Sequence, residues 1–70
     1  MRSVYVFCAD GFEEVEGLTA VDLLRRAGIN VKMVSIMGRL QITGSHNISV
    51  NTDILIEDIK EEAEMLLLPG

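Results

Sequence analysis

The 70-residue sequence lacks the features that usually stabilise a chain this short. It has one cysteine, Cys8, so no intrachain disulfide can form. It also has no Cys/His cluster with the spacing of a structural zinc site. Domains of this length bury only about 60% of the surface that their unfolded chains expose. We therefore expect that the chain binds a partner or forms part of a larger domain.

Basic residues and long apolar runs are also scarce. Six Lys and Arg against 11 Asp and Glu give a net charge of −5, which argues against a basic face for nucleic acid. No apolar run approaches the ~20 residues that span a bilayer. The N-terminus lacks the basic-then-apolar layout of a secretion signal. We therefore expect a soluble, cytoplasmic protein that binds neither nucleic acid nor a membrane.

The first half of the sequence contains apolar runs separated by turn signals. The run "SVYVFCA" (Ser3–Ala9) is typical of a strand that is covered on both faces. A helix is predicted from about Glu13 to Ala27, with Gly28 in the place of a left-handed C-terminal cap. A second strand is predicted over Asn30–Ile36.

The second half predicts smaller elements. Residues 40–56 alternate in polarity around Gly44 and suggest a hairpin, 56–63 suggest a short helical turn, and 64–70 a third buried strand. This order indicates an α/β fold with an open, mostly parallel sheet, in which ligands bind at the carboxyl ends of the strands. One full helix cannot cover both faces of such a sheet, so we interpret residues 1–70 as an incomplete, N-terminal part of a larger single domain.

The stretch "DGFEEVE" places three glutamates directly after the first strand. At about 100° per residue, Glu16 shares a helix face with four apolar residues, Ala20, Leu23, Leu24 and Ala27. We interpret this face as the stripe that packs on the sheet, with Glu14 on the opposite, solvated face and Glu13 between. Glu16 is then expected to lose water at the carboxyl edge of the sheet, where a carboxyl is a candidate functional group. The alternative is that Glu16 only complements the helix N-terminus.

Four further positions have a structural interpretation. Cys8 lies within an apolar strand with no base placed to ionise it, so we interpret it as a core thiol. His46, in the hairpin segment, is interpreted as a surface turn residue. Leu18 and Val21 fall opposite the proposed apolar stripe and suggest a subunit contact.

The segment "CADGFEEVEGLTAVDLLRRAGINV", followed by "LLLPG", resembles the N-terminal part of the DJ-1/ThiJ/PfpI family, in the class I glutamine-amidotransferase-like superfamily. The resemblance covers the whole chain, and its specific motif is "GFEEVE…D…RRAGI". It implies a flavodoxin-like α/β sandwich that is usually dimeric and close to three times this length. It also implies a glyoxalase that converts methylglyoxal to lactate without a cofactor, a deglycase, a chaperone or, in the PfpI branch, a peptidase.

The family's active site joins a nucleophilic cysteine on a strand-to-helix elbow, a glutamate that hydrogen-bonds it, and a histidine. By this resemblance Glu16 matches the glutamate, and Gly70 matches the start of a turn whose backbone amides face the substrate oxygen. The cysteine elbow and the histidine match nothing in this chain. The chain alone is therefore expected to be inactive, with no metal, and to need the remainder of its domain to act on a small carbonyl substrate.

The resemblance also implies a homodimer. Glu13 and Arg26 match charged positions near an anion site on the dimer side. Asp22 lies four residues before Arg26, which predicts a helix-surface ion pair, and the resemblance permits an intersubunit role for it. A function of another class stays open, in which the chain is a non-catalytic module that associates through its sheet edge and helix.

Overall fold

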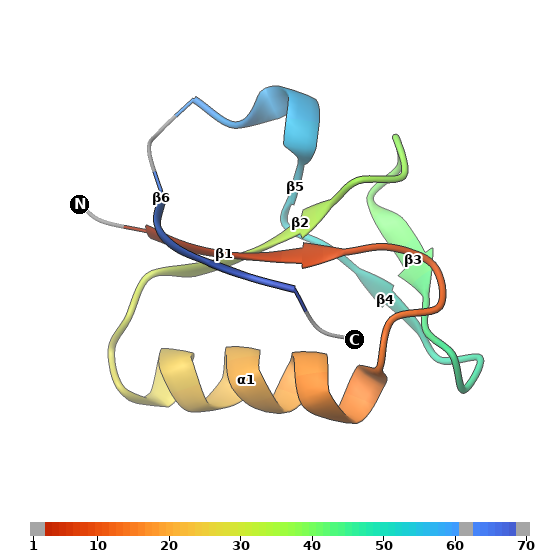
Figure 1. Cartoon of the computed structure of the whole chain (residues 1–70), viewed down its shortest axis with the longest axis horizontal. Coiled ribbons are helices and arrows are strands. Elements are labelled where there is room, and N and C mark those ends of the chain that lie inside the picture. Colours follow the sequence, from red (N-terminus) through yellow and green to blue (C-terminus); the bar gives the residue numbers. More distant parts are fainter. Residues whose placement is uncertain (1–2, 61–62, 69–70) are drawn as a thin grey trace.

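The structure is a computed structural model that describes residues 3–60 and 63–68. Its elements are, in order (Figure 1), β1 (Ser3–Cys8), α1 (Glu14–Arg26), β2 (Val31–Ser35), β3 (Gln41–Thr43), β4 (Ser49–Asn51), β5 (Ile54–Leu55), the 3₁₀ turn η1 (Ile56–Asp58) and β6 (Ala63–Leu67). This is the predicted order with one unpredicted strand, β5. The last strand is not fully buried as predicted, since Leu66 is 56% exposed.

Two sheets form from these strands. The larger has the order β5-β2-β1-β6, and every pairing in it is parallel. Val6 on β1 lies opposite Met33 on one side and Leu67 on the other. Strands β3 and β4 pair antiparallel as a separate hairpin, with Ile42 opposite Val50. The predicted open, mostly parallel α/β sheet is confirmed.

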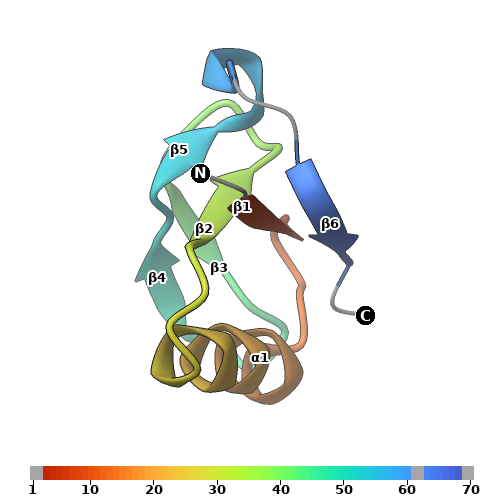
Figure 2. The same ribbon diagram turned by 90° about the vertical axis from the view of Figure 1, so that its left-hand side faces the viewer.

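Helix α1 lies along one face of this sheet (Figures 1 and 2). The alternation of side chains along a strand sends every second residue of β1 and β2 toward the helix. The buried apolar residues of this core are Val4, Val6, Cys8, Phe12, Val21, Val31, Met33 and Ile42. Ile42 comes from the hairpin, so the β3–β4 unit closes one side of the core.

The ends of α1 lie close to the predicted bounds, and Gly28 forms the predicted C-terminal cap. The Glu13 carboxylate caps the N-terminus by accepting a hydrogen bond of 3.0 Å from the amide of Val15. At the other end, Gly28 has φ of 81°, a left-handed conformation that costs glycine little, and its amide donates to the carbonyl of Arg25. The Arg26 guanidinium contacts Asp22 at 3.0 Å, which confirms the predicted helix-surface pair.

The predicted apolar face of α1 is wrong in part, although Leu24 packs against the core as expected. Leu23 is 60% exposed and Ala27 is exposed, whereas Val21 is buried in the core and Leu18 packs against it. Leu18 and Val21 therefore do not form the outer, subunit-contact face that the sequence suggested. Apolar residues occur all round this helix, so its periodicity does not decide its orientation. Gly17 is also buried, one helical turn before Val21 on the same side of the helix.

None of the helices in the described part of the chain has the length and hydropathy that crossing a membrane requires.

Candidate functional site

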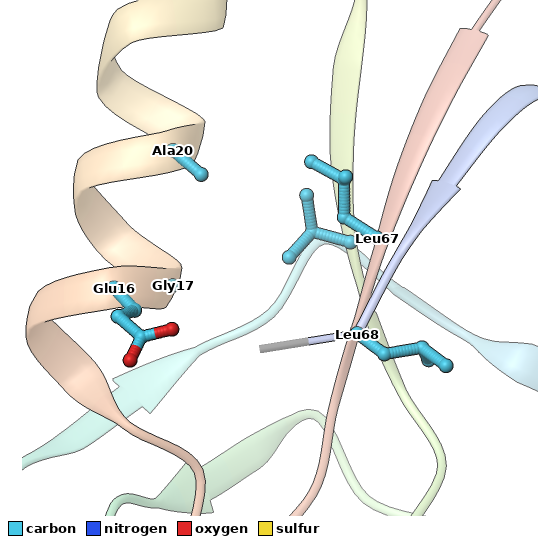
Figure 3. Close-up of a pocket in the computed structure, with 6 residues that line it drawn as sticks. Glu16, Gly17, Ala20, Leu67 and Leu68 are labelled. Atoms are coloured by element: carbon cyan, nitrogen blue, oxygen red, sulfur yellow. The ribbon is translucent and has the colours of Figure 1, made fainter. Parts of the chain in front are cut away.

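A pocket opens between the first turns of α1 and the carboxyl end of β6 (Figure 3). Its volume is about 190 Å³. It is lined by Val6, Glu16, Gly17, Ala20, Leu67 and Leu68. Glu16 supplies the carboxylate among these otherwise apolar or backbone surfaces. An apolar hollow with one ionisable group at the carboxyl edge of a parallel sheet is the usual setting of a ligand site.

The position of Glu16 differs in part from the sequence-based expectation. Glu16 does line a pocket at the carboxyl edge, and its side chain lies on the flank of α1 that faces Leu68 (Figure 3). It is not desolvated under the helix, since it is exposed in the described structure. The buried residues of α1 are Glu14, Gly17 and Val21, so Glu16 lies at the flank of the buried face.

A second hollow, of about 270 Å³, lies at the end of β1. It is lined by Phe7, Ala9, Asp10, Gly11, Phe12, Ile36 and Leu68. Leu68 therefore borders both hollows. Residues 9–12, in the turn between β1 and α1, line this second hollow, so the conformation of the turn shapes its wall.

The buried carboxylate of this turn belongs to Glu14, which is only 2% exposed. Its Oε2 accepts hydrogen bonds from the backbone amides of His46 at 2.7 Å and Ile48 at 3.3 Å. Its Oε1 accepts from Nδ1 of His46 at 2.8 Å and from the hydroxyl of Ser45 at 3.4 Å. The prediction that Glu14 is solvated is wrong, because the turn of the β3–β4 hairpin covers it and supplies these donors.

These contacts shift the ionisation of both partners. Burial alone would raise the pKa of the Glu14 carboxyl. The hydrogen bonds from the His46 ring and from backbone amides have a larger, opposite effect, and the pKa is lowered to about 2. The hydrogen bond to Glu14 and its negative charge raise the pKa of His46, and the charge of Glu13 adds to this. Glu14 is thus held as a carboxylate beside a histidine that gains a proton more readily than usual.

Glu13, Glu14 and His46 bring three potential ligand atoms within 4.8 Å of one another. Both oxygens of Glu14 already accept hydrogen bonds, and Nδ1 of His46 points at one of them. A cation would have to displace these donors, so we assign no metal to this cluster. We call the Glu14 carboxylate together with its donors from Ser45, His46 and Ile48 the clasp.

The hairpin is also fastened to the strand-to-helix turn by backbone contacts. The amide of Gly11 donates to the carbonyl of Thr43 at 2.8 Å, and the amide of Ser45 donates to the carbonyl of Phe12 at 2.9 Å. The Asp10 carboxylate accepts from the amide of Thr43 at 3.0 Å.

Asp10 also forms an ion pair with Arg39. The amide of Thr43, together with Arg39, holds the pKa of the Asp10 carboxyl below its usual value. The residues that enter α1 are therefore tied to β3 and to the segment before it.

Cys8 is a core thiol, as the sequence predicts. It is 1% exposed, and its thiol donates weakly to the carbonyl of Val6 at 3.5 Å. Burial raises the pKa of Cys8 to about 11, and the negative charge of Asp53 contributes. Such a thiol is almost entirely protonated at neutral pH and is not suited to nucleophilic attack.

The remaining predicted site residues are not brought together within the chain. Glu13 caps the start of α1 and Arg26 lies in its last turn, so at ~1.5 Å per residue they are separated by roughly 20 Å along the helix. Within this chain they therefore do not form one site. Asp22 is exposed beside Arg26. Gly70 lies outside the described residues.

An open parallel sheet with a pocket at the carboxyl ends of its strands defines a flavodoxin-like α/β protein, and comparison with known proteins agrees. The DJ-1/PfpI family matches residues 2–70. A Parkinson disease protein 7 homologue from Danio rerio is 34% identical over 71 residues, covering 99% of this chain and 38% of that protein. A protein named as a deglycase from Thermococcus kodakarensis is 34% identical over 68 residues, covering 96% and 40%.

Solved structures agree with the sequence comparison. A DJ-1 superfamily protein from Salmonella typhimurium superposes with a TM-score of 0.95 at 30% identity, covering 100% of this chain and 38% of that chain. Toxoplasma gondii DJ-1 gives a TM-score of 0.95 at 31% identity, covering 100% and 39%. The chain therefore belongs to the DJ-1/PfpI family, and it spans less than half of the length of these relatives.

The Glu14–His46 clasp was not predicted from the sequence. A buried carboxylate needs donors, and its donors come from a hairpin turn far along the chain. The available signal was Gly44 directly before Ser45 and His46, since a side chain at residue 44 would overlap the Glu14 carboxylate.

Proposed function

We propose that this chain works as the N-terminal part of a cysteine-dependent enzyme that acts on reactive carbonyls. The observation that carries this proposal is the pocket at the carboxyl edge of the sheet, with Glu16 in its wall. Membership of the DJ-1/PfpI family and a relative named as a deglycase support it. The rest of the domain supplies the nucleophilic cysteine and the histidine, and the complete protein is a cytoplasmic homodimer.

In this proposal Glu16 supports the nucleophile. A protonated carboxyl donates a hydrogen bond to a thiolate, which favours the thiolate form, and it takes part in proton transfer with the carbonyl substrate. Leu67 and Leu68 form the apolar wall of the pocket opposite Glu16. The amide of Gly70 would face the substrate oxygen. Cys8 takes no part, because its thiol is buried and protonated.

The test uses the natural protein that contains this chain, after an intact-mass measurement has established its length. Glu16→Gln should lower the turnover of methylglyoxal by about 10²–10⁴-fold, the typical contribution of general acid–base catalysis. Glu57→Gln, an exposed carboxylate on η1, is the matched control and should leave turnover unchanged. Glu14 is unsuitable as a control because it is buried. Full activity of the Glu16 variant would remove this assignment.

A non-catalytic association module is the second candidate. Leu66 is 56% exposed and Leu68 is 78% exposed at the β6 edge, which is the kind of surface that pairs with another chain. If the natural protein ends near residue 70, sedimentation should show a self-associated species and no turnover of methylglyoxal. A cooperatively melting monomer at low concentration would contradict this candidate. Hydrolysis of a protein substrate without turnover of methylglyoxal would instead favour a PfpI-like peptidase.

A further inference from the structure

The clasp at Glu14 joins α1 directly to the β3–β4 hairpin, in addition to the backbone hydrogen bonds that tie the hairpin to Gly11 and Phe12. Glu14 lies in the first turn of α1, and its donors come from the turn that connects β3 and β4. Both carboxylate oxygens are used, and in the described residues no buried polar side-chain atom lacks a partner. A fully satisfied buried carboxylate of this kind fixes geometry more strongly than a surface contact does.

The hairpin turn is shaped to this carboxylate. A Cβ at residue 44 would overlap the side chain of Glu14, so only glycine leaves the required space. The amide of Gly44 donates to the carbonyl of Ile48 at 2.9 Å, which closes the turn and aims the amides of His46 and Ile48 at one oxygen.

The first turn of a helix is its least self-sufficient part. Its leading amides have no partner within the helix, and helix ends fray. In α1 this turn carries Glu16 on the wall of the pocket, two residues after Glu14. The place of Glu16 therefore depends on what holds the backbone of residues 13–17.

We infer that Glu14 is a positioning residue, whose buried carboxylate holds the first turn of α1 against the hairpin and so sets where Glu16 meets the pocket. This role rests on the proposed function, in which Glu16 acts on a nucleophile beside that pocket. Catalytic groups must be held to within about 0.5 Å of their productive geometry by supporting contacts. Glu14 provides such support without touching the substrate.

The first test is kinetic and uses the natural protein. Glu14→Gln keeps the shape of the side chain but places an amide donor among the donors of the hairpin turn. We expect kcat for methylglyoxal to fall by about 10–100-fold with KM within about twofold, because a shift of ~1 Å in a catalytic group can cost about 10²-fold. Glu57→Gln should change neither constant. An unchanged kcat in a folded Glu14→Gln variant would overturn the inference.

The second test reports position without using activity. In Glu14→Gln, the amides of His46 and Ile48 and the helix amide of Gly17 should all exchange hydrogen about tenfold faster or more, because the clasp protects both elements. Faster exchange confined to His46 and Ile48 would show that Glu14 stabilises only the hairpin, and would overturn the positioning role.

Two further variants keep the outcomes separate. If Glu14→Gln does not fold, His46→Gln removes the ring contact and leaves the backbone bonds, and it should change kcat and the exchange of Gly17 in the same direction by a smaller factor. No change in either quantity would overturn the inference. Full activity of Glu16→Gln overturns the proposed function, while the exchange of Gly17 still shows whether Glu14 holds the first turn.

Discussion

On the side of the β3–β4 hairpin, the turn between β1 and α1 is held by carboxylates and backbone hydrogen bonds. On the side of β6, the same turn faces a pocket whose walls come largely from Leu67, Leu68 and the backbone of Gly17. The hairpin side is therefore polar and hydrogen-bonded, and the β6 side is open and apolar. A ligand site needs both, because an open side admits a substrate only if the other side keeps the reactive groups in place.

Both carboxylates of this comparison lie within one helical turn. Glu14 points to the hairpin and is 2% exposed, whereas Glu16 lines the pocket and is exposed. Two positions along a helix correspond to a rotation of about 200°. This rotation is enough to bury the side chain of Glu14 under the hairpin turn and to leave that of Glu16 exposed in the wall of the pocket.

The largest effect on stability is expected from a substitution at Gly44, in the hairpin turn that covers Glu14. Gly44→Ala places a methyl group inside the space of the Glu14 carboxylate. Overpacking of this kind should lower the free energy of unfolding by about 2–3 kcal/mol, or the melting temperature by roughly 10–20 °C in a small domain.

Gly38→Ala is the control for this change. Gly38 has φ of 78°, but a Cβ at this residue would meet open space, since among the described residues no atom beyond its chain neighbours lies within 4 Å of that position. Backbone strain alone should then cost about 1 kcal/mol. An effect of Gly44→Ala no larger than that of Gly38→Ala would show that the clasp tolerates displacement.

The next largest effect on stability is expected at Cys8, the last residue of β1. Cys8→Ser places a hydroxyl in an apolar core and should cost about 1–3 kcal/mol of stability, measured by thermal unfolding, while turnover of the natural protein is kept. In the native protein at pH 8, a pKa of about 11 leaves only about one thiol in a thousand ionised. A thiol reagent should therefore react far more slowly than with the unfolded chain. Loss of turnover with an unchanged melting temperature would contradict this.

The pH dependence of stability separates the contributions of Glu14 and His46. The pKa of Glu14 is lowered from 4.5 to about 2 on folding, so its contribution is full above pH 4.5 and is lost as the pH falls toward 2. The pKa of His46 is raised above 6.5 by Glu14 and Glu13, the acidic groups that face it, so its contribution is full below pH 6.5 and is lost as the pH rises through the raised value.

The clasp should therefore stabilise the fold most between about pH 4.5 and 6.5. Melting temperatures measured from pH 2 to 9 should show this maximum. In His46→Gln the decline on the alkaline side should be weaker, and an identical profile in both proteins would contradict the role of the histidine.

The smallest effect is expected far from the turn, at the other end of α1. Asp22→Asn breaks the exposed pair with Arg26, which should cost only a few tenths of a kcal/mol, because exposed helix pairs are weak. The melting temperature should fall by a few degrees at most. A large fall that depends on protein concentration would indicate instead that Asp22 contributes to a subunit interface.

The sequence predicted the elements of this fold because their signals are local. The apolar run of β1, the glycine cap at Gly28 and the alternation around the hairpin each depend on neighbouring residues. The order of these elements along the chain was also enough to predict the parallel sheet and to place Glu16 near its carboxyl edge.

The orientation of α1 could not be predicted in the same way. It depends on contacts with distant parts of the chain, such as the hydrogen bonds that the hairpin turn donates to Glu14. Such contacts have no signature within the helix itself, and apolar residues such as Leu18 and Leu23 lie on both of its flanks. The buried carboxylate was therefore assigned to the wrong glutamate.

The walls of the pocket also set the order in which it can appear during synthesis. Strand β1, helix α1 and strand β2 are contiguous and can pair as soon as they leave the ribosome, whereas Leu67 and Leu68 lie at the far end of the described chain. At about 5–20 residues per second, the hairpin clasp has a few seconds to form before β6 arrives. Glu16 and the residues of the clasp are thus synthesised before the surface that lies opposite Glu16, and β6 is the last strand to reach the edge of the sheet at β1.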